Sequence, residues 1–222
     1  MTRFFTLLFA VALFAACGGP EGTEVESSAA EAETSTTEMV KAAQYVIDAS
    51  ASTINWEGGK LIGGGHNGTL GITDGQIMVA GDRLVGGKFA IDLRKLENLD
   101  IDDAEGKAKL EGHLKSADFF DVENYPMADF VITNVQPAAA GAEDGVTHNI
   151  TGNLTMKGKS RSVTIPAVVS MDGKQLKAST PAFTIDRTEW GVEYGSGSLE
   201  GIAKDNIIND EIGLQIMLVA NQ

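Results

Sequence analysis

The feature that most constrains the fold of this chain is a two-residue alternation of apolar and polar side chains in its C-terminal half. In the stretch NITGNLTMKG, Ile150, Leu154 and Met156 fall on one face, and threonine, asparagine and lysine fall on the other. The stretches SVTIPAVVSM and DEIGLQIMLVA repeat the pattern. Because successive side chains of a strand point to opposite faces, these stretches are predicted to be strands with one buried face.

Turn sequences separate most of the predicted strands. DGK follows one strand at 172–174 and TDG precedes another at 73–75. Shorter strand-like runs, such as QIMVAG, RLVGGKFAIDL and ADFVITNVQ, occur earlier in the chain. Many short strands at this spacing predict an all-β sandwich or a closed antiparallel barrel. A barrel of about eight strands is wide enough to hold one small ligand.

One segment departs from the alternation. In DDAEGKAKLEGHLKS and the alanine that follows it, Leu110, Leu114 and Ala117 recur at the spacing of one helix face. Asp102 and Asp103 are residue types that favour a helix start. The sequence therefore predicts one short helix near residues 103–116, placed against the mouth or the flank of the strands.

The N-terminus has the pattern of an export signal. Arg3 precedes an apolar run of 13 residues, FFTLLFAVALFAA, that ends at Ala16 and is followed by Cys17. Such a run is too short to span a bilayer, which takes about 20 residues, but it is typical of a signal peptide. The pattern resembles the lipobox of bacterial lipoproteins, which predicts a signal peptide at 1–16 and lipidation of Cys17, the only cysteine of the chain. An ordinary signal peptide is the alternative.

Residues 17–42 are predicted to form a disordered acidic tether, and residues 43–222 a single folded domain. The segment from 18 to 42 has six glutamates and little apolar surface. The net charge of the chain is −14 without any basic run, which argues against a nucleic-acid partner. The expected location is the bacterial cell envelope, at the outer membrane, in the periplasm or on the cell surface.

Catalytic and metal-binding motifs are poorly represented. Asp118 and Asp121 in HLKSADFFDVENYPMADF allow either acid–base chemistry or the capping of short helical turns, and capping is favoured. His66, His113 and His148 do not have the close spacing of metal ligands. Neither a GxSxG nor a phosphate-loop motif is present. We therefore expect no enzyme activity, no metal site and no cofactor.

Three motifs together resemble the YceI family of bacterial periplasmic and lipoprotein-type proteins. They are GHLKSADFFDVENYPMADFVI, ITGNLTMKGKSRSVTIP and FTIDRTEWGVEYG, in this order, and the resemblance covers residues 45–220. It implies an extended lipocalin-like antiparallel barrel whose apolar tunnel holds a polyisoprenoid chain, such as the tail of a quinone. The segment INWEGGKLIGGGHNGTLGI departs from the more regular family pattern, because it is rich in glycine and carries Trp56, Lys60 and His66.

Two functions remain open at this point. The first is the carriage of a polyisoprenoid or similar amphiphile by a lipid-anchored protein, and the second is an envelope scaffold or stress-related interaction module without a ligand. The apolar strand faces could line a tunnel or fill a solid core, and the resemblance favours the tunnel. Its predicted lining consists of Phe130, Ile132, Leu154, Met156, Ile165, Leu214, Ile216 and Leu218. His66 and His113 are predicted to be polar groups near a ligand head group. Asp186 and Arg187 are predicted to pair or anchor a strand end, and Trp190 to plug the barrel.

Overall fold

The computed structural model describes residues 19–33, 41–199 and 201–222. Most of these residues lie in strands, and the described part has one α-helix. The predicted signal peptide and Cys17 lie outside the described residues. The main strands are β3 (Ala43–Ile47), β4 (Thr53–Gly59), β5 (Gly65–Ala80), β6 (Arg83–Asn98), β7 (Met127–Pro137), β8 (His148–Met156), β9 (Lys159–Asp172), β10 (Gln175–Ser179), β11 (Phe183–Asp186) and β12 (Glu211–Asn221).

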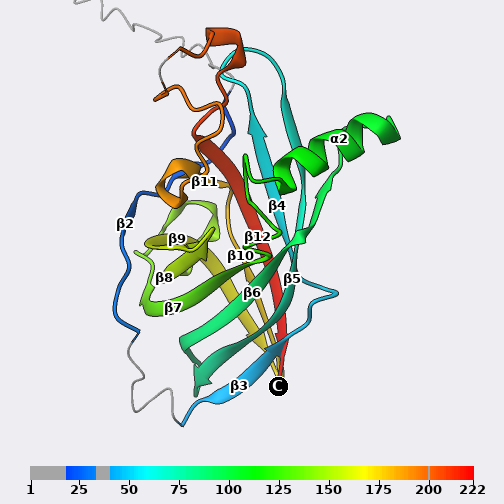
Figure 1. Ribbon diagram of the computed structural model, residues 1–222. Coiled ribbons are helices and arrows are strands. Elements are labelled where there is room, and N and C mark those ends of the chain that lie inside the picture. The colour runs from blue at the N-terminus through cyan, green and yellow to red at the C-terminus, as the bar shows by residue number, and fades with distance from the viewer. Residues whose placement is uncertain (1–18, 34–40, 200) are drawn as a thin grey trace, which may run out of the picture.

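The strands close into a ring (Figure 1). From β5 to β10 each strand pairs antiparallel with the next one in sequence, and β10 pairs with β12. Two strands, β3 and β4, complete the ring by filling the same place between β5 and β12. β4 joins β5 to β12 near one end of the ring, and β3 joins the same two strands near the other end. The prediction of an antiparallel all-β barrel of about eight strands is therefore confirmed, although the ring is irregular.

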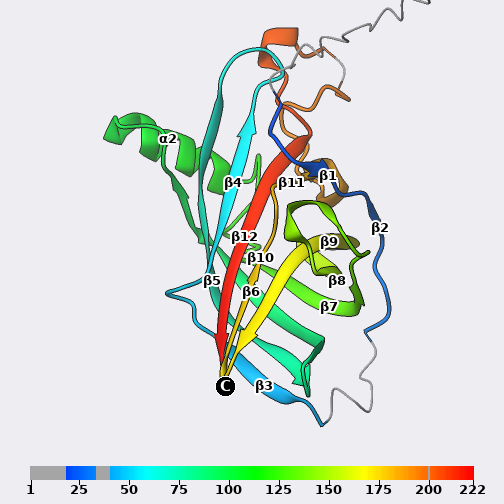
Figure 2. The ribbon, with the colours of Figure 1, turned by 180° about the vertical axis from the view of Figure 1, so that it is seen from behind.

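The irregularity lies between β9 and β12. β10 is short and pairs only with the 168–172 part of β9. Beyond it, β12 pairs with β11, and the gap between β11 and β9 is occupied by the N-terminal segment (Figure 2). Within this segment β1 (Thr23–Glu24) pairs parallel with β11, and β2 (Ser27–Ala29) pairs antiparallel with β9.

The predicted disordered tether is therefore wrong for residues 19–33. We call this segment the strap. Main-chain hydrogen bonds to two strands hold it, and Val25 between them is 7% exposed. Glu31 forms further hydrogen bonds. Its main-chain N–H donates to Asn153 Oδ1, and its carboxylate accepts from the Thr133 hydroxyl. Composition suggested disorder because the strap has few apolar residues, but strand edges supply backbone partners that do not depend on side chains.

The single α-helix, α2 (Ala104–Lys115), begins and ends close to the predicted bounds. Asp103 is its N-cap and accepts a hydrogen bond from the Gly106 N–H, and Ser116 is the C-cap. None of its residues is fully buried, and it projects from the side of the ring opposite the strap (Figures 1 and 2). Within the described ranges, no helix is both long enough and apolar enough to cross a bilayer.

One half of the barrel interior is a solid core. The buried side chains at the end that holds β3 and the C-terminus include Tyr45, Val79, Leu84, Leu176 and Ala220. Leu176 and Ala220 are fully buried. This closed end leaves the opposite half of the barrel, beneath α2 and the β4–β5 hairpin, as the place where a cavity can form.

Candidate ligand-binding cavity

A cavity of about 650 Å³ occupies the other half of the barrel. Its walls are overwhelmingly aliphatic and aromatic, and they come from β4, β5, β6, β7, β8, β9, β11 and β12 together with α2. The cavity reaches the β4–β5 hairpin, where Lys60, Ile62 and Gly64 line it while remaining exposed to solvent. The hairpin therefore marks the mouth of a blind cavity whose floor is the solid core.

Six of the eight residues predicted to line a tunnel do line this cavity: Phe130, Leu154, Met156, Ile165, Leu214 and Ile216. Ile132 and Leu218 do not belong to the lining, although they are 7% and 4% exposed. Each lies two residues beyond a lining residue, on the same strand face but closer to the closed end. Alternation identified the inward face, and the depth of the core determines where along that face the cavity stops. Whether the lining residues contact a ligand stays a prediction.

The N-terminal strands contribute lining residues beyond those predicted from the sequence. Ile54 and Leu70 face the cavity from β4 and β5, and Phe89, Ile91 and Leu93 face it from β6. The last three alternate with other residues, so the two-residue period was a usable signal. Glycines and bulges obscured it, since the pairing of β5 with β6 shifts register at three points.

Trp56 covers one wall of the cavity near the hairpin. Its indole ring lies against the main chain of Gly68, where an added Cβ would be 2.7 Å from the ring and would also collide with the Glu97 carbonyl oxygen. A glycine at this position therefore lets the ring pack against β5. Its Nε1 is buried and has no hydrogen-bond partner, which is uncommon for a buried donor.

His113 anchors an aromatic cluster near the mouth. Its ring meets the rings of Phe119 and Tyr194 edge-on, with centroids 5.0 and 4.8 Å away, and its Nε2 lies 3.2 Å from Asp118 Oδ2. His113, Phe119 and Phe120 all line the cavity. The two phenylalanines thus pack in the core beneath the helix and face the cavity at the same time.

The aspartates of the same segment have local structural contacts. The carboxylate of Asp121 accepts hydrogen bonds from Asn124 Nδ2, and its backbone has a positive φ of 50°. Asp118 pairs with His113, and its N–H donates to Ser116 Oγ. Neither carboxylate caps a helical turn through a backbone N–H in the described structure, so the capping prediction is replaced by these side-chain contacts.

His66 lies on β5 at the mouth and also lines the cavity. Its Nδ1 is 2.9 Å from Asp100 Oδ2, while Asp100 Oδ1 accepts from the Asn67 N–H and from Asn98 Nδ2. Partial burial raises the pKa of Asp100, but these hydrogen bonds outweigh burial and leave that pKa below its ordinary value. The structure therefore brings His66 and His113, 47 positions apart in sequence, to the lining of one cavity.

Arg187 lies near the mouth of the cavity, is 2% exposed and links several main-chain segments. Its guanidinium donates to the carbonyl oxygens of Val192, Ile208 and Asn209, and its Nη2 lies 3.2 Å from Asp210 Oδ1. The predicted partnership with Asp186 is corrected, because the pair is with Asp210. Burial lowers the pKa of Arg187, and the carboxylates of Asp210 and Asp186 oppose that shift.

Asp186 instead caps the short η2 helix (Arg187–Trp190) by accepting from the Thr188 N–H and hydroxyl. Trp190 of this helix is fully buried and donates its indole N–H to the Leu154 carbonyl oxygen at 2.8 Å. This hydrogen bond holds η2 against β8, and side chains of β8 line the cavity.

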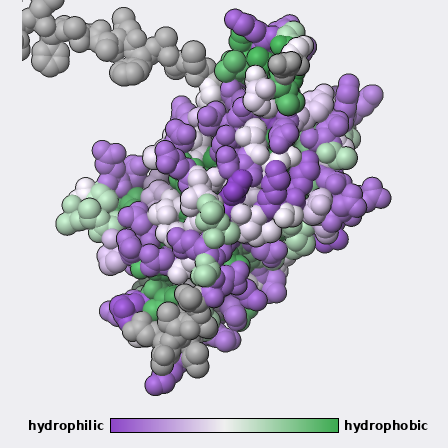
Figure 3. Space-filling view, turned by 60° about the vertical axis from the view of Figure 1, so that its left-hand side comes forward, coloured by the Kyte–Doolittle hydropathy of each residue, from purple (hydrophilic) through white to green (hydrophobic). Residues whose placement is uncertain are grey.

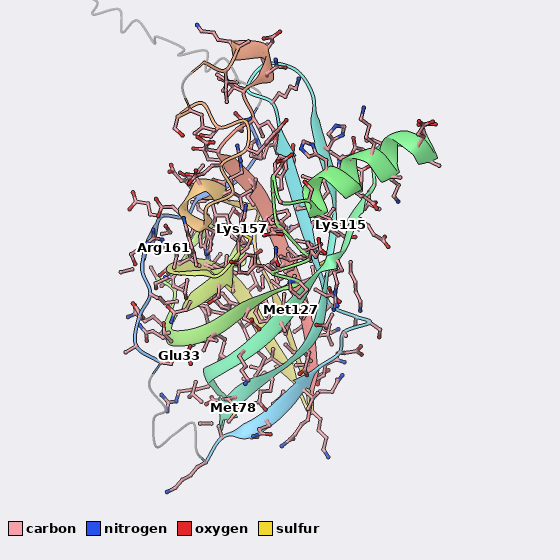
Figure 4. All side chains as sticks on the ribbon, viewed as in Figure 1. Glu33, Met78, Lys115, Met127, Lys157 and Arg161 are labelled. Carbon is pink, nitrogen blue, oxygen red and sulfur yellow. The ribbon has the colours of Figure 1, made fainter. Side chains whose placement is uncertain are left out.

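Two cationic side chains fasten the outer wall (Figure 4). Lys157, in the β8–β9 turn, donates to the Phe119 carbonyl oxygen at 2.6 Å and so holds the segment that follows α2. Arg161 on β9 places Nε 3.2 Å from Glu189 Oε2 of η2. The first contact holds the segment that contributes Phe119 and Phe120 to the cavity lining, and the second holds η2 against β9.

The chemistry of the cavity suits binding. Within residues 19–33, 41–199 and 201–222, no three histidine, cysteine, aspartate or glutamate side chains gather as metal ligands would. The polar groups near the mouth, His66, His113 and Arg187, all have protein partners. An apolar enclosure with a few polar groups at one end is the arrangement expected for an amphiphile with a long hydrocarbon part.

Comparison with known proteins supports this picture. The YceI-like domain model matches residues 45–220. A UPF0312 protein of Pseudomonas putida strain F1 is 33% identical over 135 residues, which cover 60% of this chain. The chain spans 65% of the length of that relative.

Two solved structures have similar folds. The crystal structure of Burkholderia cenocepacia BcnA superposes with a TM-score of 0.60 at 24% identity, and the match covers 79% of this chain and 99% of BcnA. A polyisoprenoid binding domain from Saccharophagus degradans superposes with a TM-score of 0.55 at 17% identity, covering 80% of this chain and 97% of that domain. At these identities the likeness establishes a shared fold.

Proposed function

This chain belongs to the YceI-like family, and from that premise we propose that it binds a polyisoprenoid or a similar long amphiphilic lipid, such as a quinone, without catalysing a reaction. The observation that carries the proposal is the apolar cavity of about 650 Å³, which is open at one end of the barrel. Similarity to a protein named for polyisoprenoid binding supports the choice of ligand class.

The size of the cavity bounds the part of the ligand that it can enclose. At roughly 30 Å³ for each heavy atom, the volume share of a water molecule in the liquid, the cavity accommodates about 20 carbon atoms. This corresponds to about four isoprene units. A longer chain would have to leave the barrel through the mouth.

The polar groups near the mouth suit a ligand whose head group stays at that end. His113 and His66 line the cavity there while the opposite end is closed by apolar side chains. A hydroxyl, carbonyl or phosphate group placed at the mouth could exchange hydrogen bonds with imidazole nitrogens. The hydrocarbon chain would then fill the interior.

The proposal includes attachment to the bacterial cell envelope through a lipidated Cys17. The motivation is the single cysteine at the end of a short apolar run. Acyl chains on this residue would supply the two or more signals that stable membrane attachment requires. Changing Cys17→Ser should then move the exported protein from the membrane fraction to the soluble fraction. Persistent sedimentation of the serine variant with membranes would count against the lipid anchor.

The main test is the lipid content of the purified protein. An organic extract analysed by mass spectrometry should contain a polyisoprenoid in a fixed ratio to protein, and delipidated protein should regain it from added lipid. A Leu214→Asp variant introduces a charge into the lining and should lose most of the bound lipid, while Met217→Asp on the same strand points outward, is 43% exposed and should retain it. Extracts of the parent without lipid, together with no uptake, would favour the alternative of a scaffold without a ligand.

A further inference from the structure

Exposed apolar side chains gather around the mouth of the cavity. Ile62 and Leu61, in the β4–β5 hairpin, are 59% and 49% exposed, and Leu199 is 43% exposed. The main chain connects them, because Leu61 N–H donates to the Ile207 carbonyl oxygen and Ile208 forms bridges with Lys60 and Ser196. Figure 3 shows hydrophobic surface at this end of the molecule. We call Leu61, Ile62 and Leu199 the apolar rim.

The strap leads the chain to this rim. Gly19, where the described N-terminal segment begins, lies next to Asn209, whose N–H donates to the Gly59 carbonyl oxygen in the hairpin. Pro20 lies against Gly213 of β12. Within the strap β1 pairs with β11 and β2 pairs with β9, and these pairings place its first residues at the mouth end. A disordered tether would have left the orientation of the barrel free.

The distance from Gly19 to the proposed anchor is short. Two residues span at most about 7 Å of extended chain, so the attachment point of a lipid on Cys17 would lie within about that distance of Gly19. Acyl chains on Cys17 would therefore enter the bilayer directly beside the rim. The part of the surface closest to the membrane would then be the one that carries the mouth.

The surface around the rim carries charges of both signs. The whole chain has a net charge of −14, and beside the rim exposed Lys60 and Lys204 stand among exposed acidic residues, which include Glu57, Glu193 and Asp205. Exposed leucine and isoleucine side chains flanked by lysine are the composition of surfaces that sit at a membrane interface.

From these observations we infer that the apolar rim docks on a lipid bilayer, so that the mouth of the cavity opens into the membrane. This inference rests on the proposed function and extends it. A hydrocarbon chain longer than the cavity would keep its outer part in the bilayer while its inner part fills the barrel. Loading and release would then occur without exposing the chain to water. The predicted role of Cys17 becomes one of orientation as well as attachment.

The test measures which part of the surface touches lipid. Residues 17–222 contain every described element and only one cysteine, so the Cys17 thiol can be coupled to a maleimide lipid in vesicles whether or not cells acylate it. The vesicles contain phosphatidylcholine with brominated acyl chains, which quench tryptophan by contact, and phosphatidylglycerol. An Ile62→Trp variant reports on the rim. A Val46→Trp variant is the matched control, because Val46 is also 59% exposed but lies on β3 at the closed end. The parent gives the background of its two native tryptophans.

We expect the fluorescence added by Ile62→Trp to be mostly lost on brominated vesicles, while that added by Val46→Trp is retained. Equal quenching of both variants, or of neither, overturns the docking inference. Uptake of an isoprenoid from detergent solution tests the proposed function separately, and it is measured on the parent without vesicles because Ile62 itself lines the cavity. Retained uptake by the parent with unquenched Ile62→Trp refutes the docking alone, and absent uptake by the parent with quenched Ile62→Trp refutes lipid carriage alone.

Discussion

Filling the cavity from within should separate ligand binding from stability. Met156 lines the cavity from β8 and is 6% exposed. Changing Met156→Trp adds about six heavy atoms, or about 180 Å³ at roughly 30 Å³ each. That is more than a quarter of the 650 Å³ available. The ring therefore has room, provided that no lipid occupies the space.

The expected results have opposite signs for the two forms of the protein. In delipidated protein the added ring gains apolar contacts, so the free energy of unfolding stays level or rises. In the lipid-bound form about six carbons lose their place, and at about 0.8 kcal/mol per CH₂ the upper bound of the loss is about 5 kcal/mol. Even about 1 kcal/mol lowers the affinity roughly fivefold. Thermal melts of delipidated protein and mass spectrometry of bound lipid measure the two effects.

Leu176→Trp is the matched control. Leu176 is fully buried at the closed end and does not line the cavity. A larger ring there overpacks the core and should cost about 1–3 kcal/mol or more. If Met156→Trp destabilises the delipidated protein as strongly as Leu176→Trp does, the cavity is not available space and the reasoning from its volume is refuted.

Three further perturbations test the surroundings of the cavity. Asp118→Asn and Asp121→Asn should each cost at most about 1 kcal/mol, since exposed ion pairs contribute little and asparagine tolerates a positive φ; a folded variant that has lost its lipid would contradict this. Gly68→Ala should cost about 1–3 kcal/mol or more through collision with a main-chain oxygen and the tryptophan ring. The control Gly64→Ala, whose added Cβ meets nothing within 4 Å, should not be destabilised in this way. Equal melting temperatures of the two variants would refute the argument. Because the pKa of Asp100 is lowered in the folded protein, its ionised carboxylate stabilises the fold at pH values above the unfolded-state pKa of about 3.9. This contribution is lost as the pH falls through the folded-state pKa. Thermal melts between pH 7 and pH 3 should therefore show a steeper loss of melting temperature for the parent than for Asp100→Asn. Parallel curves would exclude a contribution of the Asp100 carboxylate to stability.

The two-residue period predicted much of the fold because it reflects local geometry. Alternation at Ile150, Leu154 and Met156 fixes which face of β8 is buried, whatever the rest of the chain does. The helix at 104–115 was equally local, with Asp103 as a side-chain cap. Closure of the strands into a barrel came from the family resemblance, since alternation alone is shared by sandwiches and barrels.

The candidate site depended on contacts that no local pattern contains. Phe130 and Ile132 share one strand face, yet only Phe130 lines the cavity, because the depth of the solid core is set by side chains from many strands at once. Arg187 pairs with Asp210 in place of its sequence neighbour. Such long-range pairs form only when the elements are brought together.

The structure of the strap also depends on contacts that its own sequence does not reveal. Its composition predicts disorder, because residues 19–33 bury little apolar surface of their own. The tertiary structure decides otherwise, since the short β10 leaves the edges of β9 and β11 unpaired beside the strap. The sequence by itself determined which side chains face inward, because that follows from the geometry of each strand. Only the tertiary structure decided how deep the cavity runs, which edges stay open and where the N-terminal segment leads, because those depend on how strands distant in sequence pack together.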